Sequence, residues 1–420
     1  MSSQRLRINM KVQKTDNQNN NNLPNGWRKV KLGEIVNIKM GQSPSSQFYN
    51  SRGEGLPFYQ GITDFGSKYP NKSVYCTNTI KIAEKGEILF SVRAPVGEVN
   101  VAIEKSCIGR GIAALSMKNK NNEFLYYLLK YRTQYFKSIS GGTTYESIGK
   151  DQIAEIELLI PEDINEQKRI ASILSAFDDK IELNNKIIKT LEEMAQEIFK
   201  EWFVRFRFPG WQKAKFVDSE LGKIPEGWEI SKIGEKLTTI LGGTPSTSNK
   251  SYWENGDIPW INSGAINDFP IINPTNFITK KGLENSAAKL MPVKTVVLPL
   301  VISIGKPVNI SMLVKEMSGN QSVVGIVGND KITPEYIYCW VQYKKQEIYG
   351  SASGGAQQHI NKNIIDSTLI LIPKGEILDS FNQKVVSFFD TIIKKAFENQ
   401  TLAILRDLLL SKLMSGEIKI

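Results

Sequence analysis

Two sets of polar, glycine-rich loops, one in each half of the chain, carry residues that could contact a polyanion. Glycine lets a backbone approach a ligand closely, and Ser, Thr and Asn side chains bond phosphates or base edges. Arginine can fork onto guanine, and Gln or Asn onto adenine. The candidates are Gly41, Gln42, Ser43, Ser45, Arg93, Arg110, Gly141, Gly142, Thr143 and Thr144, followed by Gly243, Thr244, Ser246, Asn262, Ser263, Lys306, Gln321, Gly354, Gly355, Gln357 and His359. We expect these loops to contact nucleic acid, although each loop taken singly also fits a plain turn and His359 also fits an ordinary surface hydrogen-bonder.

The charge distribution separates these loops from one long stretch of the chain. The net charge is +10 over 420 residues. Ten acidic and six basic residues lie between Glu162 and Glu201, so this stretch carries −4 and the rest of the chain +14. A polyanion would therefore meet the parts outside the stretch. A generally soluble basic protein remains the alternative on charge alone.

Residues that would indicate catalysis by this chain are missing. There is no NPPY- or DPPY-type methyltransferase loop, no GxxxxGK[ST] phosphate loop and no HExxH. His359 is the only histidine, which excludes His pairs and multi-His metal sites. Glu166-Gln167-Lys168 matches half of a nuclease site, but a helix cap explains Glu166 better. We expect no catalytic residues and no metal site.

The acidic stretch has the pattern of one long helix. From Asp163 to Phe203, seam positions recur in 3–4 alternation, which predicts a helix packed along a partner helix. Asp163 can cap the first turn with Glu166, and Pro209-Gly210 ends the pattern. A second such helix is expected from about Ile377 to Met414. The expected interface positions are Ile170, Leu174, Phe177, Ile181, Asn184, Ile188, Leu191, Ile392, Asn399, Leu405 and Leu409.

The domains on either side of the long stretch are copies of one another. NGWRKVKLGE returns as EGWEISKIGE, GQSP as GGTP, LPFYQG as IPWINSG, and SISGGTTYESIGKDQI as SASGGAQQHINKNII. Trp27 and Trp228 are 201 residues apart, whereas Gly141 and Gly354 are 213 apart, so insertions occur within a shared scaffold. Short strand-like runs (Glu87–Val92, Ile153–Ile160) and a helix over Asn122–Ser138 predict an α/β domain.

These patterns predict an α+β chain of two tandem α/β domains, separated by an antiparallel two-helix coiled coil with pseudo-two-fold symmetry. An Asn in each seam would fix the register of the helices and with it the domain separation. The expected segments are a disordered leader (1–24), domain 1 (25–161), a central helix (162–205), a linker (206–224), domain 2 (225–374) and a C-terminal helix (375–416).

Composition indicates a cytoplasmic protein. Cys76, Cys107 and Cys339 form no CxxC pair, which is typical of reduced thiols. The N-terminus has no apolar signal region, and the longest apolar run, Thr295–Ser303, is too short to span a bilayer. We expect no membrane association.

The chain resembles the DNA-specificity (S) subunits of type I restriction-modification systems. The matching stretches are GWRKVKLGE, GQSP, SVRAPVG, CIGRGIAAL, ISGGTTYESI, IPEDINEQKRIASILSAFDDKIELN, VDSELGKIPEGWE and LRDLLLSKLMSGEIKI, which cover nearly all of the chain after residue 25. The first copy has GRG at Gly109–Gly111 where the second has NQS at Asn320–Ser322. This difference indicates different half-site targets.

The resemblance implies two target-recognition domains, each reading one half of a split double-stranded DNA sequence, and no catalysis by this subunit. It implies two methyltransferase (M) subunits, which bind S-adenosylmethionine and methylate adenine, and restriction (R) subunits, which use ATP and Mg to cleave unmodified DNA. The acidic helices would dock the M subunits. A non-catalytic interaction scaffold and a stand-alone DNA-binding protein remain as alternatives.

Overall fold

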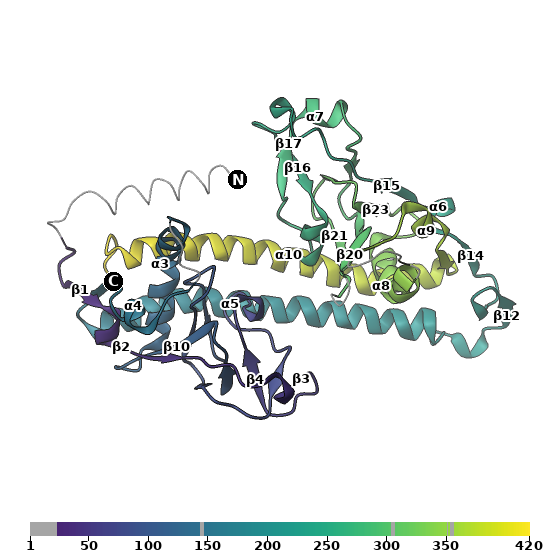
Figure 1. Ribbon diagram of the computed structural model, residues 1–420. Coiled ribbons are helices and arrows are strands. Elements are labelled where there is room, and N and C mark those ends of the chain that lie inside the picture. Colours follow the sequence, from purple (N-terminus) through teal and green to yellow (C-terminus); the bar gives the residue numbers. More distant parts are fainter. Residues whose placement is uncertain (1–22, 143–146, 304–306, 351, 353–356) are drawn as a thin grey trace. The chain divides into compact units, whose positions relative to one another are not determined.

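The computed structural model describes residues 23–142, 147–303, 307–350, 352 and 357–420 (Figure 1). The predicted leader therefore lies outside the described residues except for Leu23 and Pro24. By its internal contacts the chain divides into two compact units. Among described residues, the first unit comprises 23–182 with 400–420, and the second comprises 183–399.

The first unit is built on two sheets and a two-stranded clasp. Its strands run in the orders β2-β10-β7-β8 and β3-β5-β4-β9-β6, and β1 pairs with β11. The elements are β1 (Trp27–Lys31), α2 (Leu32–Ile35), β2 (Val36–Met40), β3 (Tyr49–Asn50), β4 (Leu56–Tyr59), β5 (Tyr75–Cys76), β6 (Ile82–Ala83), β7 (Ile88–Ser91), β8 (Val99–Val101), β9 (Ser106–Ile108), β10 (Ile112–Met117), α3 (Asn122–Gly142), α4 (Lys150–Ala154) and β11 (Glu157–Pro161). Helix α3 anchors the core, since residues 124–129 are at most 1% exposed.

The strand predicted over Ile153–Ile160 is wrong in its first part. Residues Lys150–Ala154 form helix α4, which Gln152 starts by accepting a hydrogen bond from the Gly149 amide at 2.8 Å. The strand begins only at Glu157, and just before it the Ile156 carbonyl accepts from the Leu32 amide at 2.8 Å, in register with the pairing of β1 and β11.

The second unit repeats this plan. Its sheets have the orders β15-β23-β19-β21 and β17-β16-β22-β18, with β14-β25, β20-β24 and β12-β13 as pairs. The elements are β12 (Phe216–Ser219), β13 (Gly222–Pro225), β14 (Glu229–Lys232), α6 (Ile233–Lys236), β15 (Thr238–Leu241), β16 (Ile258–Ile261), β17 (Asn276–Ile278), α7 (Lys280–Glu284), β18 (Leu290–Met291), β19 (Val296–Pro299), β20 (Val301–Ser303), β21 (Ser311–Met312), β22 (Met317–Gly319), β23 (Val323–Val327), α8 (Pro334–Gly350), β24 (Gln357–His359), α9 (Lys362–Ser367) and β25 (Leu369–Ile372). The predicted duplication is confirmed down to single bonds, since the Ile233 amide donates to the Thr368 carbonyl as Leu32 does to Ile156.

Two long helices contribute to both units: α5 (Ile164–Phe199), which ends in a π-helical turn at Lys200–Val204, and α10 (Gly375–Met414). Within the second unit they are antiparallel, because Asn184 contacts Asn399 while Phe199 lies near Phe381. At the start of α5, Asp163 accepts from the Asn165 amide at 2.8 Å.

The seam of the helix pair follows the predicted pattern on α5 and departs from it near the end of α10. On α5, Ile170, Leu174, Asn184 and Ile188 are at most 8% exposed, whereas the predicted positions Phe177, Ile181 and Leu191 are only partly buried. On α10, the seam position predicted for Leu405 is wrong, because that side chain is 44% exposed. The seam shifts by one residue to Arg406, whose guanidinium reaches a buried carboxylate on α5.

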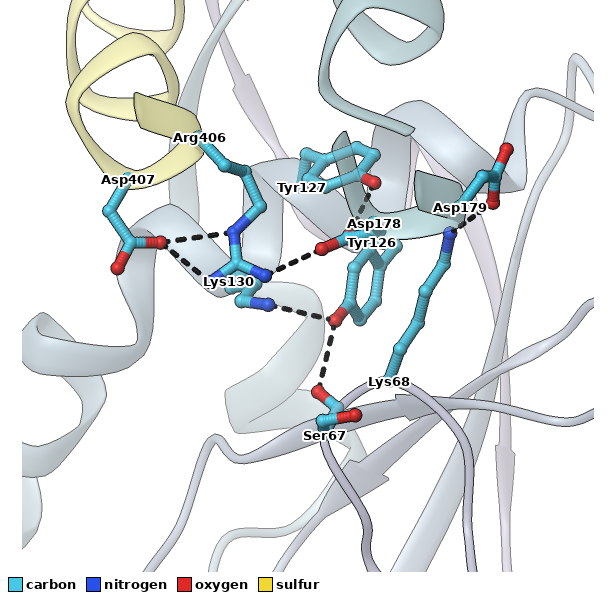
Figure 2. A network of polar contacts seen from close by, with 9 residues as sticks. All are labelled: Ser67, Lys68, Tyr126, Tyr127, Lys130, Asp178, Asp179, Arg406 and Asp407. Atoms are coloured by element: carbon cyan, nitrogen blue, oxygen red, sulfur yellow. Dashed lines mark hydrogen bonds and ion pairs between the residues drawn. The ribbon is translucent and has the colours of Figure 1, made fainter. Parts of the chain in front are cut away.

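A buried polar network joins α3, α5 and α10 in the first unit (Figure 2). Asp178 on α5 accepts from the Tyr127 hydroxyl at 2.6 Å and from Arg406 Nη1 at 2.5 Å. Lys130 Nζ donates to the Tyr126 hydroxyl at 3.0 Å. Burial raises the pKa of Asp178, but Lys130, Tyr127 and Arg406 outweigh it, so the pKa lies below its ordinary value. The network therefore fixes the first domain to both helices with charged groups.

The second unit has its own polar connections between domain and helices. The Tyr338 hydroxyl on α8 donates to Glu192 on α5 at 2.6 Å. Lys294 bridges Glu335 on α8, at 2.8 Å, and Asp390 on α10, at 3.1 Å. Each domain is thus attached to its helices by polar as well as apolar contacts.

Candidate nucleic-acid interface

The topology of the first unit brings its polar loops together at one end of a sheet, where neighbouring strands begin or end. Strand β10 runs antiparallel to both β2 and β7, with Ala113 opposite Met40 and Ile112 opposite Ser91. The same end of the sheet therefore carries the loop after β2, the residues after β7 and the turn before β10. That turn, Gly109–Gly111, holds Arg110.

Hydrogen bonds tie the loop after β2 to this turn. The Gly41 amide donates to the Ile112 carbonyl at 2.9 Å, and the Arg110 amide donates to Ser43 Oγ at 3.1 Å. A Cβ on Gly41 would lie 2.2 Å from the Gly109 carbonyl oxygen, so close packing of the two segments accounts for this glycine. The side chains of Gln42, Ser45 and Arg110 are exposed. The backbone of the turn is fixed while the Arg110 side chain faces solvent.

Arg93 lies beside this turn. It forms a β-bridge with Ser147, and the neighbouring Ile148 amide donates to the Val92 carbonyl at 2.9 Å. The Val92 amide in turn donates to the Gly111 carbonyl at 3.0 Å. The exposed Arg93 therefore lies next to Gly109–Gly111, at the same end of the sheet.

The glycine pair Gly141-Gly142 is not a free loop as predicted. It forms the last two residues of α3, which continues past the predicted end at Ser138. Thr143 and Thr144 lie outside the described residues, as do Lys306, Gly354 and Gly355 of the second copy.

The second unit places the same loops at the equivalent edge. The Gly242 amide donates to the Val323 carbonyl at 3.0 Å and the Gly243 amide to the Gly319 carbonyl at 2.7 Å. A Cβ on Gly242 would lie 2.2 Å from the Asn320 carbonyl oxygen, matching the close approach at Gly41. The turn before β23, Asn320–Ser322, thus corresponds to Gly109–Gly111.

This correspondence pairs the candidate residues one by one. Gln321 occupies the place of Arg110, and its Oε1 accepts from the Thr244 hydroxyl at 2.5 Å. Val301 occupies the place of Arg93, because it pairs with His359 in β20-β24 as Arg93 pairs with Ser147. His359 is exposed on β24, which Gln357 begins.

The remaining candidates of the second copy lie on the neighbouring strand and loop. Asn262 follows β16, and its Oδ1 accepts from the Gly264 amide at 2.9 Å, so it caps the short helical turn that begins at Ser263. The Asn320 amide donates to the Ile261 carbonyl at 2.9 Å, so Asn262 lies next to the turn Asn320–Ser322. Ser246 bonds Ser248 through their hydroxyls at 2.8 Å.

Sequence reasoning missed two residues of the first edge. Exposed Gln60 follows β4, and a Cβ on Gly111 would lie 2.1 Å from its carbonyl oxygen. The echo of LPFYQG in IPWINSG could have found it, since it aligns Gln60 with Asn262. Ser147 carried no such signal, because its pairing with Arg93 depends on the fold.

Other kinds of site find no support in the described ranges. There, no group of three or more His, Cys, Asp or Glu side chains is placed to hold a metal ion. None of the helices in the described part of the chain is long and apolar enough to cross a membrane.

Comparison with known proteins agrees with the duplication. A family model described as the type I restriction modification DNA specificity domain matches residues 24–193 and again residues 225–406. The MjaIX type I restriction enzyme specificity subunit of Methanocaldococcus jannaschii is 28% identical over 414 residues, covering 95% of both chains. The HindI specificity subunit of Haemophilus influenzae is 28% identical over 408 residues, covering 80% of this chain and 88% of that protein. A crystal structure of a type I S subunit from M. genitalium has a similar fold, with a TM-score of 0.56 at 18% identity over 94% of this chain and 97% of that one.

Proposed function

Because this chain belongs to the type I restriction modification DNA specificity family, we propose that its two domains each read one half of a bipartite double-stranded DNA target. The observation that carries the proposal is the repetition of one exposed polar turn, held by the same backbone bonds, in both domains. Two readers suit a split target, and different side chains in the two turns suit unlike half-sites.

In this proposal the helices set the gap between the half-sites. Support comes from the antiparallel contacts of α5 with α10 and from their lengths of 36 and 40 residues. At about 1.5 Å per residue, seven extra residues add roughly 10 Å, which corresponds to about three base pairs.

The chain is proposed to act without catalysis of its own, in the cytoplasm, as the addressing subunit for partner enzymes. Two methyltransferase subunits would supply S-adenosylmethionine chemistry on adenine, and restriction subunits would supply ATP- and Mg-dependent cleavage. In this proposal the partner subunits dock on the two long helices. Exposed apolar side chains on these helices are Ile164, Leu405 and Leu408 in the first unit and Leu183, Met194 and Phe397 in the second, each between 39% and 50% exposed.

The test is methylation mapping in a host that lacks other adenine methylation. The chain is expressed with its methyltransferase subunit, and methylated adenines are located by single-molecule sequencing. We expect one motif made of two short blocks separated by a fixed gap. A complex that methylates without a split motif, or that binds no DNA in a gel shift, would instead indicate a scaffold without DNA readout.

The gap is tested by inserting one heptad into both α5 and α10, at Asn185 and at Glu398, so that the helices stay matched. The gap in the methylated motif should grow by about three base pairs while both blocks remain. As a control, the same heptad inserted in the exposed turn between β12 and β13 should leave the gap unchanged. An unchanged gap in the helix variant would refute the ruler.

A further inference from the structure

The two reading turns carry different side chains at one equivalent position, Arg110 in the first domain and Gln321 in the second. The equivalence rests on the fold and on paired bonds. In the first domain the Gly109 amide donates to the Tyr59 carbonyl, and the Ile112 amide to the Gly109 carbonyl. In the second, Asn320 and Val323 make the corresponding bonds to Ile261 and Asn320. Arg110 and Gln321 each come directly after the residue that begins the turn.

Both side chains project from a backbone that their neighbours hold in place. The Arg110 amide is fixed by Ser43 Oγ at 3.1 Å, and within the described chain no carboxylate pairs with its exposed guanidinium. The Ser322 amide donates to Asn320 Oδ1 at 3.1 Å and stiffens the second turn. An arginine without a protein partner on a rigid turn is free to bind a ligand.

The hydroxyl beside each turn acts differently in the two domains. Ser43 holds the backbone of the first turn, whereas Thr244 donates from its hydroxyl to Oε1 of the Gln321 side chain at 2.5 Å. That bond fixes the amide plane and uses one of the two lone pairs of Oε1. Within the described residues no other group bonds this amide, so the other lone pair and the Nε2 donor remain for a base. They form the acceptor–donor pattern that adenine N6 and N7 require.

We infer that Arg110 reads a guanine in one half-site and that Gln321 reads an adenine at the equivalent place in the other. Arg110 would donate two hydrogen bonds to O6 and N7 of guanine, and Gln321 would accept from N6 and donate to N7 of adenine. This inference rests on the proposed function and adds to it the base read at one position of each domain.

The experiment is a pair of reciprocal substitutions, Arg110→Gln and Gln321→Arg, made separately in the full chain expressed with its methyltransferase subunit. Methylated motifs are mapped for each variant. Arg110→Gln should lower the preference for guanine at one position of one block on the order of tenfold to a hundredfold, with adenine favoured there, and leave the other block unchanged. Gln321→Arg should do the reverse in the other block.

Arg52→Gln is the matched control, because Arg52 is an exposed arginine of the same domain that pairs with Glu54. It makes the same chemical change away from the turn and should leave the motif as in the wild type. If Arg110→Gln lowers methylation equally at all sequences, Arg110 contacts phosphate and the inference is overturned, although the wild-type split motif still supports the proposed function.

Loss of methylation in a variant would be resolved by a binding selection. Duplexes bound by the variant complex are selected from a library randomised in the affected half-site, with Arg110→Lys as a second variant that keeps the charge without the fork. Undiminished guanine preference in Arg110→Gln would overturn the assignment, whereas Arg110→Lys, which can still donate to O6 and N7, should keep part of that preference. A wild-type complex without any split motif would instead refute the proposed function.

Discussion

Arg406 Nη1 on α10 lies 2.5 Å from Asp178 Oδ1 on α5, and both side chains are largely buried. The Tyr127 hydroxyl on α3 donates to the other oxygen of the same carboxylate at 2.6 Å. Asp178 is thus the point at which the first domain and both helices of its unit meet (Figure 2).

Replacing Asp178 should destabilise the first unit. Among the described residues, Asp178→Asn leaves Arg406 with only Asp407 as an acidic partner, so we expect a loss of about 3 kcal/mol, the low end for breaking a buried pair. Asp179→Asn is the control, since that carboxylate is 67% exposed and 3.7 Å from Lys68, and it should cost less than about 1 kcal/mol. Urea unfolding with hydrogen exchange of α3 measures both, and equal effects would contradict the role assigned to Asp178.

The same carboxylate should make stability depend on acid. The native pKa of Asp178 is lowered from 3.8, because Lys130, Tyr127 and Arg406 outweigh the effect of burial. As pH falls, the unfolded chain therefore takes up a proton at this carboxyl before the native chain does. The contribution of Asp178 to stability is fully present above pH 3.8 and is lost as pH falls through the native pKa. Unfolding midpoints measured at pH 6 and at decreasing pH should fall less steeply in Asp178→Asn than in wild type. Parallel curves would show that other groups govern the acid response.

The sequence predicts the arrangement of the fold better than its charged contacts. Trp27 and Trp228 begin the two copies, and the strand pairs and sheets of one copy match those of the other. This match is expected because backbone pairing follows the apolar patterns, which recur in the same order in both copies. The seam failed at Leu405, since a heptad pattern assigns an apolar residue to the interface. Arg406 occupies the interface because Asp178, 228 residues away, neutralises it, and no local pattern reveals such a partner.

The candidate DNA-binding loops were predicted only in part, because their contacts with one another also depend on partners far away in the sequence. The duplication of GQSP and GGTP located the loops, and the GRG and NQS difference located the turns. Two features depend on strand register: the close approach of Gly41 to the Gly109 carbonyl and the pairing of Ser147 with Arg93. The sequence of a loop does not encode that register.

The asparagine pair in the seam should determine the register of the helices. Asn184 is fully buried and its Nδ2 donates to Asn399 Oδ1 at 2.9 Å, while Asn184 Oδ1 has no hydrogen-bond donor among the described residues. Replacing both with Leu should raise the free energy of unfolding by about 1 kcal/mol and permit other registers. Methylation mapping should then show more than one gap length.

Lys189→Leu is the control for this pair, because Lys189 is exposed on the same helix and its loss adds an apolar side chain without touching the seam. It should leave a single gap length. A double variant with increased stability and one unchanged gap would show that apolar packing alone sets the register.

Gly41 should be required for reading by the first domain and for little else. A Cβ at Gly41 would lie 2.2 Å from the Gly109 carbonyl oxygen and 2.6 Å from that of Ile112, so Gly41→Ala must push the Arg110 turn aside. We expect a loss of about 1–3 kcal/mol in binding to the half-site of this domain, the contribution of one base contact, with the other half-site read normally. Gly375→Ala is the control, because nothing lies within 4 Å of a Cβ there and the residue begins α10, away from both turns. Binding of duplexes altered in one half-site at a time measures both variants, and a Gly41→Ala complex that binds like Gly375→Ala would show that the position of the turn does not govern recognition.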